Sequence, residues 1–342
     1  MQLKEALKRV IKICPKAKDA ALFRSVRFVA GTGTEPSRVF TSDGVCMAAI
    51  PVDNALPDAL ISNDGLASAV KDSGDLEIGV TAEGQLSLFG TNGTYKLKSS
   101  ENVDYFPSPP ETPENFVEIT WWLVQKVLHA TARDQAGPEL SVVHFSPEYI
   151  EAFDQVRLAR VEMDGSWSGC VPARLFKHWP GGSVETVFNE HYAFFRIGGE
   201  QLRIANLTKL AYPDTDKLIA PITSGGSFLV DSERFRETIQ QATEVSPINL
   251  VMLNPVMLNA LEGAVRVVAC DAGGTLDAYE GVVPSAVCQG TPGKATVDGK
   301  LLQQALKQCD TPNLKITVGE NVDPLRIEAG NLIECIWQRY WE

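Results

Sequence analysis

The sequence predicts an α+β fold built from three similar units, each with two helices packed on antiparallel sheets. Three observations predict it. Apolar residues at helical spacing recur about every 110 residues, short segments of alternating polarity follow them, and turn-forming dipeptides separate those segments. Helices and strands segregated in this way are typical of α+β proteins rather than of alternating βαβ units.

Each unit is predicted to open with a helix. Residues 3–13 place apolar side chains at 3, 6, 7, 10, 11 and 13, which is the period of one helix face. Segments 121–133 and 232–243 repeat this pattern, and Asp231 or Ser232 can cap the third helix. We expect the second helices of the units over residues 64–70, 173–179 and 298–307.

Two further features repeat between these helices. An extended segment ends at an aspartate in each unit, namely 38–43, 149–154 and 266–271. An apolar-Pro step follows it each time, and there we expect the proline to close a strand or begin a linker. These prolines are Pro51, Pro172 and Pro284.

The remaining chain reads as strands joined by glycine turns such as Asn92-Gly93, Gly198-Gly199 and Gly273-Gly274. The expected strands include 76–80, 84–89, 95–98, 185–188, 192–197 and 314–318. The Pro-rich segment 107–113 reads as a semi-rigid linker, and 215–225 is a second boundary. The predicted domains are therefore 1–113, 114–222 and 223–342.

Charge is distributed unevenly along this acidic chain. The net charge is −12, which by itself argues against nucleic-acid binding because phosphate neutralisation needs Lys and Arg. Residues 1–20, however, hold six Lys or Arg against two acidic residues. An acidic protein with locally basic helices can contact DNA on one surface, although a solvated helix face is the simpler interpretation.

No motif for catalysis, cofactor binding or metal binding stands out. The chain has no phosphate loop, no nucleophile elbow and no dinucleotide-binding glycine pattern in a strand-to-helix context. Its seven cysteines form no Cys-x-x-Cys pair and its four histidines are not at ligand spacing. We expect a non-enzymatic protein without cofactor or metal. Scattered cysteines and the absence of a signal-like or membrane-spanning segment fit the cytoplasm.

The segment Gln85-Leu-Ser-Leu-Phe89 is similar to the short peptide with which other proteins dock on bacterial sliding clamps. It alternates in polarity between turn residues, so an ordinary strand is the favoured interpretation.

As a whole, the chain resembles the bacterial sliding clamp, the beta subunit of the replicative DNA polymerase III. The resemblance covers essentially the whole sequence, through the order and spacing of its units. Its best local matches are 171–176, Phe145 with 157–159, and 211–218. Where the family has a Gly-His pair, this chain has Gln155-Val156, a divergence that suggests a phage, a plasmid or an unusual lineage.

The resemblance implies the DNA-clamp fold and a head-to-tail homodimeric ring around duplex DNA, in the cytoplasm with the nucleoid. Helices would line the hole and contact phosphate without reading bases. The cations that would face DNA are Lys4, Lys8, Arg9, Lys12, Lys126, Arg133, Arg174, Lys177, Arg234, Arg236, Lys300 and Lys307.

The resemblance also implies an apolar pocket that takes an extended peptide from DNA polymerase, the clamp loader and other partners. Gln338 stands where the family has an apolar residue, which indicates either a more polar pocket or a different peptide. Packing between domains is the competing role for each residue. The implied pocket residues are Leu140, Val156, Arg157, Leu158, Pro213, Lys217, Leu218, Ile336 and Gln338.

Two other functions stay open at the level of sequence. One is a clamp-fold interaction protein that binds replication partners without loading on DNA. The other is an enzyme of repeated α+β architecture with a site assembled only in space. A dimer in solution favours the clamp, and a cleft holding a strongly perturbed titrating group favours the enzyme.

Overall fold

The structure is a computed structural model. It describes the residues in the following ranges: 1–14, 21–33, 35–82, 84–100, 103–132, 140–176, 179, 182–198, 201–208, 211–219, 225–257, 262–269, 279–290, 293–319 and 323–338, with only the backbone of 21, 22 and 287–289. The chain forms two compact units. Unit 1 comprises Met1–Trp121 and Val171–Thr208, and unit 2 comprises Trp122–Cys170 and Lys209–Glu342.

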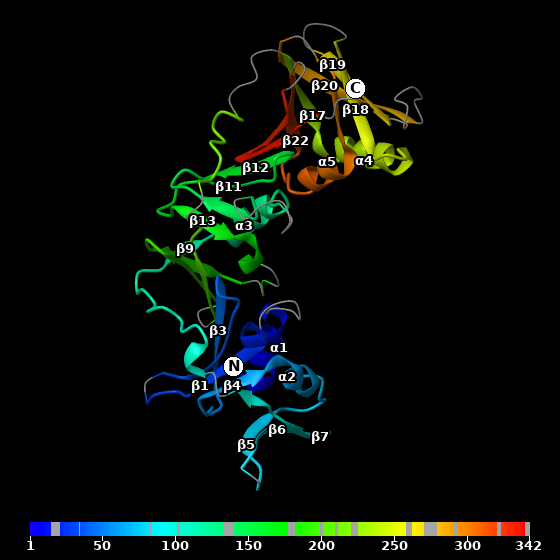
Figure 1. The fold of residues 1–342 in the computed structure, drawn as a ribbon. Coiled ribbons are helices and arrows are strands. Elements are labelled where there is room, and N and C mark those ends of the chain that lie inside the picture. Colours follow the sequence, from blue (N-terminus) through cyan, green and yellow to red (C-terminus); the bar gives the residue numbers. More distant parts are fainter. Residues whose placement is uncertain are drawn as a thin grey trace. The chain divides into compact units, whose positions relative to one another are not determined.

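Unit 1 combines two α-helices with a nine-stranded antiparallel sheet, in the order β8-β4-β1-β2-β3-β16-β15-β14-β9, and a three-stranded sheet β5-β6-β7 (Figure 1). Its elements are α1 (Leu3–Ile13), η1 (Ala21–Arg24), β1 (Ser25–Val29), β2 (Ser37–Ser42), β3 (Cys46–Val52), β4 (Ala59–Ser62), α2 (Asn63–Ala69), β5 (Glu77–Val80), β6 (Leu86–Gly90), β7 (Gly93–Lys96), β8 (Ser99–Ser100), η2 (Val103–Tyr105), β9 (Val117–Ile119), η3 (Ala173–Phe176), β14 (Val184–Phe188), β15 (Tyr192–Ile197) and β16 (Gln201–Asn206).

Unit 2 is built on a twelve-stranded sheet in the order β13-β10-β11-β12-β24-β23-β22-β17-β20-β19-β18-β21. Helices α4 and α5 pack against each other, and α4 also packs on β17 to β20. The elements are α3 (Trp121–Leu128), β10 (Val142–Phe145), β11 (Tyr149–Phe153), β12 (Arg157–Glu162), β13 (Gly169–Pro172), β17 (Gly225–Asp231), α4 (Ser232–Val245), β18 (Leu250–Met257), β19 (Glu262–Ala269), β20 (Tyr279–Gly290), β21 (Ala295–Asp298), α5 (Gly299–Leu306), β22 (Asn313–Gly319), β23 (Leu325–Ala329) and β24 (Leu332–Ile336).

The predicted α+β class, with helices on antiparallel sheets, is confirmed. Helix α1 buries Leu3, Ala6, Leu7 and Val10, the face that the apolar spacing predicts. These side chains join the core between the helices and the strands of unit 1. In unit 2 the Asp231 side chain caps α4 by accepting the Arg234 backbone N–H, as the sequence predicts.

Two predicted details of the fold are wrong. The segment after Pro172 forms only a short 3-10 helix, η3, within the described residues. In addition, Pro284 lies well inside β20 instead of closing a strand, whereas Pro172 is the last residue of β13 and Pro51 is one residue from the end of β3. Pro51 and Pro284 each pair with one neighbouring strand, opposite Arg38 and Ala264. The ladder to the other neighbour stops short of both prolines. A proline without an N–H partner therefore costs no ladder hydrogen bond there.

Strand pairing links segments that the sequence assigns to different domains. Strand β3 pairs with β16 in unit 1, and β12 pairs with β24 in unit 2. The segment 114–222, predicted as the middle domain, therefore contributes residues to both compact units.

Candidate functional site

One face of the unit 2 sheet holds an apolar cluster at the pairing of β12 with β24. The ladder sets Leu158 opposite Cys335 and Arg160 opposite Ile333. Paired residues of a ladder share a face, and alternate residues of a strand return to it. Leu158, Arg160, Ile333 and Cys335 therefore all point to the same side of the sheet.

Three partly buried side chains pack against the fully buried Leu158 and Cys335 and the neighbouring Ile333. They are Phe153, Ile219 and Trp337. Phe153 pairs with Leu158 across β11 and β12, and the Trp337 backbone N–H donates to the Val156 carbonyl at 2.9 Å. We call these six side chains, from Phe153 to Trp337, the Leu158 cluster.

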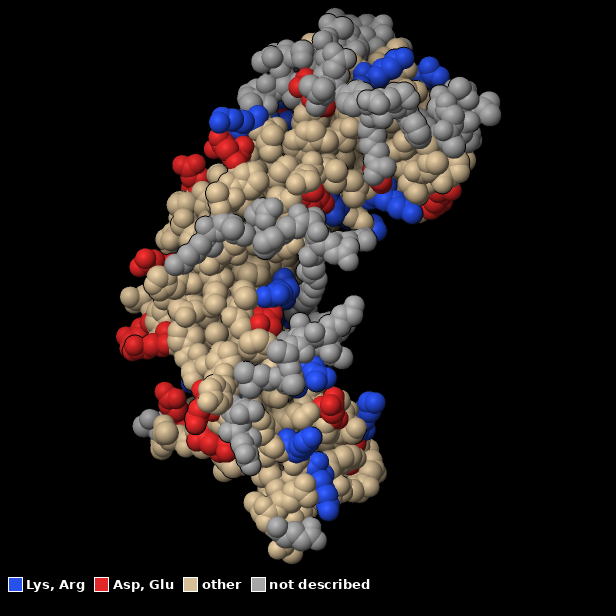
Figure 2. All heavy atoms as spheres, in the orientation of Figure 1, with Lys and Arg blue, Asp and Glu red and all other residues tan. Residues whose placement is uncertain are grey.

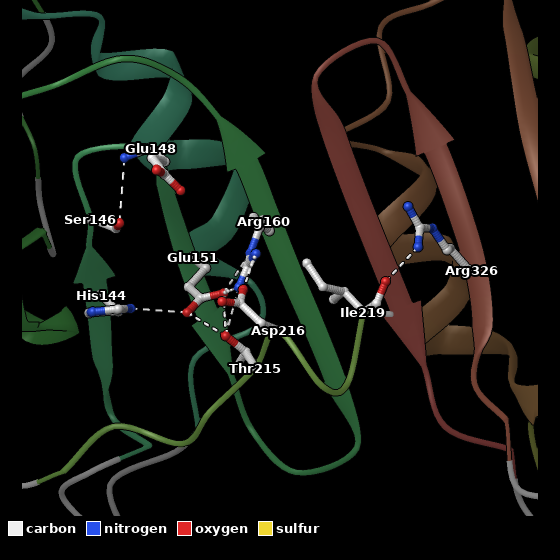
Figure 3. A network of polar contacts seen from close by, with 9 residues as sticks. All are labelled: His144, Ser146, Glu148, Glu151, Arg160, Thr215, Asp216, Ile219 and Arg326. Carbon is white, nitrogen blue, oxygen red and sulfur yellow. Dashed lines mark hydrogen bonds and ion pairs between the residues drawn. The ribbon is translucent and has the colours of Figure 1, made fainter. Parts of the chain in front are cut away.

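A buried polar network lies on the same face of the sheet (Figure 3). The fully buried Glu151 carboxylate accepts from Arg160 Nε at 2.9 Å and from the Thr215 hydroxyl at 2.8 Å. Arg160 also donates to the Thr215 hydroxyl at 2.8 Å and to the Asp216 carboxylate at 2.7 Å. His144 Nδ1 lies 3.0 Å from Glu151. We call these five residues the Thr215 network; it compensates the burial of two charges with a full set of partners.

The chain after the network is held at a second point. The Leu218 and Ile219 backbone N–H groups donate to the Thr215 carbonyl at 2.9 and 3.1 Å. Arg326 donates to the Ile219 carbonyl at 2.6 Å, as Figure 3 also shows. Residues 215–219 are thereby fixed at both ends, and Ile219 is delivered to the Leu158 cluster.

The network borders a pocket of about 500 Å³ on the surface of unit 2. Its lining is Glu148, Tyr149, Arg160, Glu162, Met163, Asp164, Asp216 and Asn331.

The opposite face of the same two strands carries a different set of side chains. Arg157 pairs with Ile336 there and donates to the Asp154 carboxylate at 2.8 Å and to the side chain of Gln304 on α5. The Glu334 carboxylate, fully buried on this face, lies 3.2 Å from His129 Nε2 of the segment after α3. Burial raises the pKa of Glu334 above its ordinary value, and the neighbouring His129 and Arg157 oppose that rise.

The predicted pocket residues accordingly fall on two sides of the sheet. Leu158 belongs to the Leu158 cluster, whereas Arg157 and Ile336 face the other way. Val156 is 45% exposed and Lys217 pairs with Asp214 at the surface. The others are placed as follows: Pro213 and Leu218 half-buried in the segment after Tyr212, Leu140 buried before β10, and Gln338 half-buried and donating to the Asp323 carbonyl at 2.8 Å.

Five residues of the Leu158 cluster are not among the predicted pocket residues: Phe153, Ile219, Ile333, Cys335 and Trp337. Counting by twos along β12 and β24 from Leu158 identifies Cys335 and Ile333, but only once the register of the two strands is known.

The cations expected to face DNA differ in their surroundings. In α1, Lys8 and Lys12 are exposed, whereas Lys4 Nζ donates to the Asp72 and Gly74 carbonyls at 2.6 Å. Arg9 pairs with Glu5 one turn away at 3.2 Å. Among the residues of η3, Arg174 pairs with Asp43 at 3.0 Å. Arg133 and Lys177 lie outside the described residues.

In unit 2, Lys126 is buried, contacts the Trp122 ring and pairs with Asp310 at 3.0 Å. Arg236 donates to the Leu306 and Cys309 carbonyls and so caps the C-terminal end of α5. The remaining cations Arg234, Lys300 and Lys307 are exposed.

Lys300, Lys307 and Arg236 line a pocket of about 420 Å³ between α4 and α5. Around these helices Figure 2 shows basic side chains next to acidic ones. In unit 1, basic side chains gather in the same figure on the side that carries α1 and α2.

Residues 86–89 of the clamp-docking-like segment 85–89 lie in β6, the central strand of the three-stranded sheet, and Gln85 directly precedes it. Leu88 and Ser87 are fully buried, and β6 pairs with β5 and β7 on its two sides. The segment is therefore a core strand and is not free to dock on another protein.

The titratable groups of the described residues offer little for catalysis. Burial raises the pKa of Cys46, Cys309 and Cys335 to about 12 and that of Cys170 to about 11, so these thiols stay protonated. Within the described residues, no group of three or more His, Cys, Asp or Glu is arranged to hold a metal ion. No helix in the described part of the chain is long and apolar enough to cross a bilayer.

The fold defined by these sheets and helices is that of the bacterial DNA sliding clamps. The clamp from Bacillus subtilis superposes with a TM-score of 0.82 over 99% of this chain and 97% of its own, at 16% identity. The DNA polymerase III beta subunit from Thermotoga maritima gives 0.79 over 100% and 99%, at 15% identity. A clamp from Bartonella birtlesii bound to griselimycin gives 0.81 over 99% and 97%, at 15% identity.

Sequence comparison adds no further relative, since neither a family model nor a curated protein matches the chain. The solved clamps share the fold of this chain although their sequences are only 11–17% identical to it.

Proposed function

We propose that this protein is a DNA sliding clamp, a non-catalytic ring that encircles duplex DNA and tethers the replicative polymerase to its template. The observation that carries the proposal is the likeness to solved clamps over the full length of the chain, with TM-scores near 0.8. The likeness covers 99–100% of this chain, and a tether needs no active site.

The ring is proposed as a head-to-tail homodimer of three-domain chains, with domains 1–113, 114–222 and 223–342. The pairings β3–β16 and β12–β24 support it, because they join neighbouring domains into continuous sheets. Head-to-tail contacts close into a ring when the rotation between subunits is cyclic. The protein would act in the cytoplasm, on nucleoid DNA.

DNA would pass through the hole along the helix side of the sheets. The exposed cations of the helices, Lys8, Lys12, Arg234, Lys300 and Lys307, are suited to contact phosphate. A few contacts of this kind are independent of base sequence and weak at physiological salt, which permits sliding. The net charge of −12 disfavours adhesion of DNA to the outer surface.

Partners would dock on the Leu158 cluster. An extended peptide with alternate apolar side chains suits a sheet face on which Trp337, Phe153 and Ile219 are only partly buried. Polymerase, clamp loader and other proteins that carry a clamp-binding peptide would share this site. The probe for it is a fluorescein-labelled synthetic peptide Gln-Leu-Ser-Leu-Phe.

Light scattering after size-exclusion chromatography tests the proposal. A ring of two chains has twice the 37.2 kDa mass of one chain. A stable monomer at micromolar concentration that still binds the peptide would instead support a clamp-fold interaction protein that does not load on DNA.

A further inference from the structure

We infer that the Thr215 network is a positioning device for the partner site: it fixes the segment 215–219, so that Ile219 completes the Leu158 cluster before a partner arrives. This inference rests on the proposed docking of a peptide on that cluster. The network itself does not have to touch the peptide.

The hydroxyl of Thr215 links the segment to the sheet. It donates to Glu151 of β11 and accepts from Arg160 of β12, so both of its hydrogen-bonding roles are used. Thr215 is 2% exposed, Arg160 5% and Glu151 0%. Contacts so well shielded from water hold their geometry more strongly than surface ion pairs do.

The link is transmitted along one turn of the chain. The Thr215 carbonyl accepts from the backbone N–H groups of Leu218 and Ile219. Arg326 of β23 then holds the Ile219 carbonyl. The side chain of Ile219 packs on Leu158, Ile333 and Cys335. Because Ile219 is already held in place, less conformational entropy is lost when a ligand binds beside it.

Arg160 also connects the Thr215 network with the Leu158 cluster. It lies two residues along β12 from Leu158, on the same side of the strand, and its guanidinium stacks on Tyr149 at 3.7 Å. The same side chain that is anchored beside the cluster thus pins Thr215 and Asp216. The network is therefore placed to set the distance between the segment and the sheet.

The test compares Thr215→Val with Thr215→Ser in peptide binding, by fluorescence anisotropy of the labelled Gln-Leu-Ser-Leu-Phe peptide. Valine keeps the volume and removes the hydroxyl, whereas serine keeps the hydroxyl. We expect the Kd to rise about tenfold for Thr215→Val and to stay within about twofold of wild type for Thr215→Ser. Binding is measured well below the thermal midpoint of each variant.

A matched control separates positioning from general loss of stability. Thr186 of unit 1 is likewise fully buried, and its hydroxyl donates to the Phe194 carbonyl at 2.8 Å. Thr186→Val should lower the thermal midpoint and leave the Kd unchanged. Asp216→Asn, at a side chain 69% exposed, should raise the Kd about threefold and keeps the test available if Thr215→Val does not fold.

The outcomes are distinct. Equal Kd values for wild type and both network variants, Thr215→Val and Asp216→Asn, would overturn the positioning role alone. A wild-type protein that does not bind the peptide would overturn the proposed partner site, and the positioning role with it.

Discussion

The Trp337 ring meets the Phe153 ring at a steep angle, with 5.7 Å between the ring centroids and 60° between the planes. The pair joins the residue after β24 to the end of β11, at the partly exposed margin of the Leu158 cluster. Partly exposed aromatic side chains beside a buried apolar residue are typical anchors of a peptide site.

Replacing Trp337 by Ala should weaken binding of the labelled Gln-Leu-Ser-Leu-Phe peptide at least tenfold, about 1.4 kcal/mol, because a large apolar surface is lost. Trp122→Ala is the matched control, since Trp122 is a tryptophan of unit 2 that lies outside the Leu158 cluster and is 44% exposed. Equal weakening by both substitutions would argue against docking at Trp337.

The Glu334 carboxylate should make stability depend on pH. Its pKa is raised in the folded protein, chiefly by burial. The unfolded chain therefore loses this proton first as the pH rises above about 4.5. The free energy of unfolding therefore falls as the pH rises from the pKa of the unfolded chain to the higher pKa of the folded protein. Glu334→Gln cannot ionise, so the free energy of unfolding of this variant should rise relative to that of wild type as the pH increases above about 4.5.

Urea denaturation across this range checks the prediction. Glu148→Gln, which removes an exposed carboxylate from the same unit, is the control and should show no such gain. A constant difference between Glu334→Gln and wild type at every pH would contradict the raised pKa.

Exposed helix cations should govern the affinity for duplex DNA. Reversing Lys8, Lys12, Lys300 and Lys307 to Glu should lower the affinity for duplex DNA at low salt, because contacts to phosphate are lost. Each lost contact should also reduce the steepness of the plot of log K against log salt by about 0.9. Lys315→Glu makes one such charge reversal on strand β22 and should leave the slope unaltered. An unchanged slope in the fourfold variant would show that these lysines do not meet DNA.

Strand β6 should behave as part of the core of unit 1 rather than as a docking peptide. Leu88→Ala should cost about 2–5 kcal/mol in the free energy of unfolding, because the side chain is fully buried. Phe89→Ala, at a side chain 38% exposed, should cost less. A loss of peptide or partner binding without a loss of stability would instead assign segment 85–89 to an interaction.

The sequence predicts local structure well where one side chain pattern decides it. The spacing of Leu3, Ala6, Leu7 and Val10 identifies the buried face of α1, and Asp231 identifies the start of α4. Helical period and capping depend on neighbours within a few residues, so one segment contains the whole signal.

The proposed partner site depends on contacts between distant segments, and its residues could be predicted only in part. Counting from the C-terminus selects Ile336, but the register of β12 with β24 puts Ile336 opposite Arg157 and Cys335 opposite Leu158. A shift of one residue exchanges the two faces of a strand. Likewise, the sequence of α3 does not reveal that Lys126 is buried and pairs with Asp310.

The most direct test of the sliding-clamp account is single-particle electron microscopy of the full-length protein. A sliding clamp should give class averages of a closed ring of two chains, with six domains around an open centre wide enough for duplex DNA. Isolated chains, open arcs or closed particles without a central hole would contradict it.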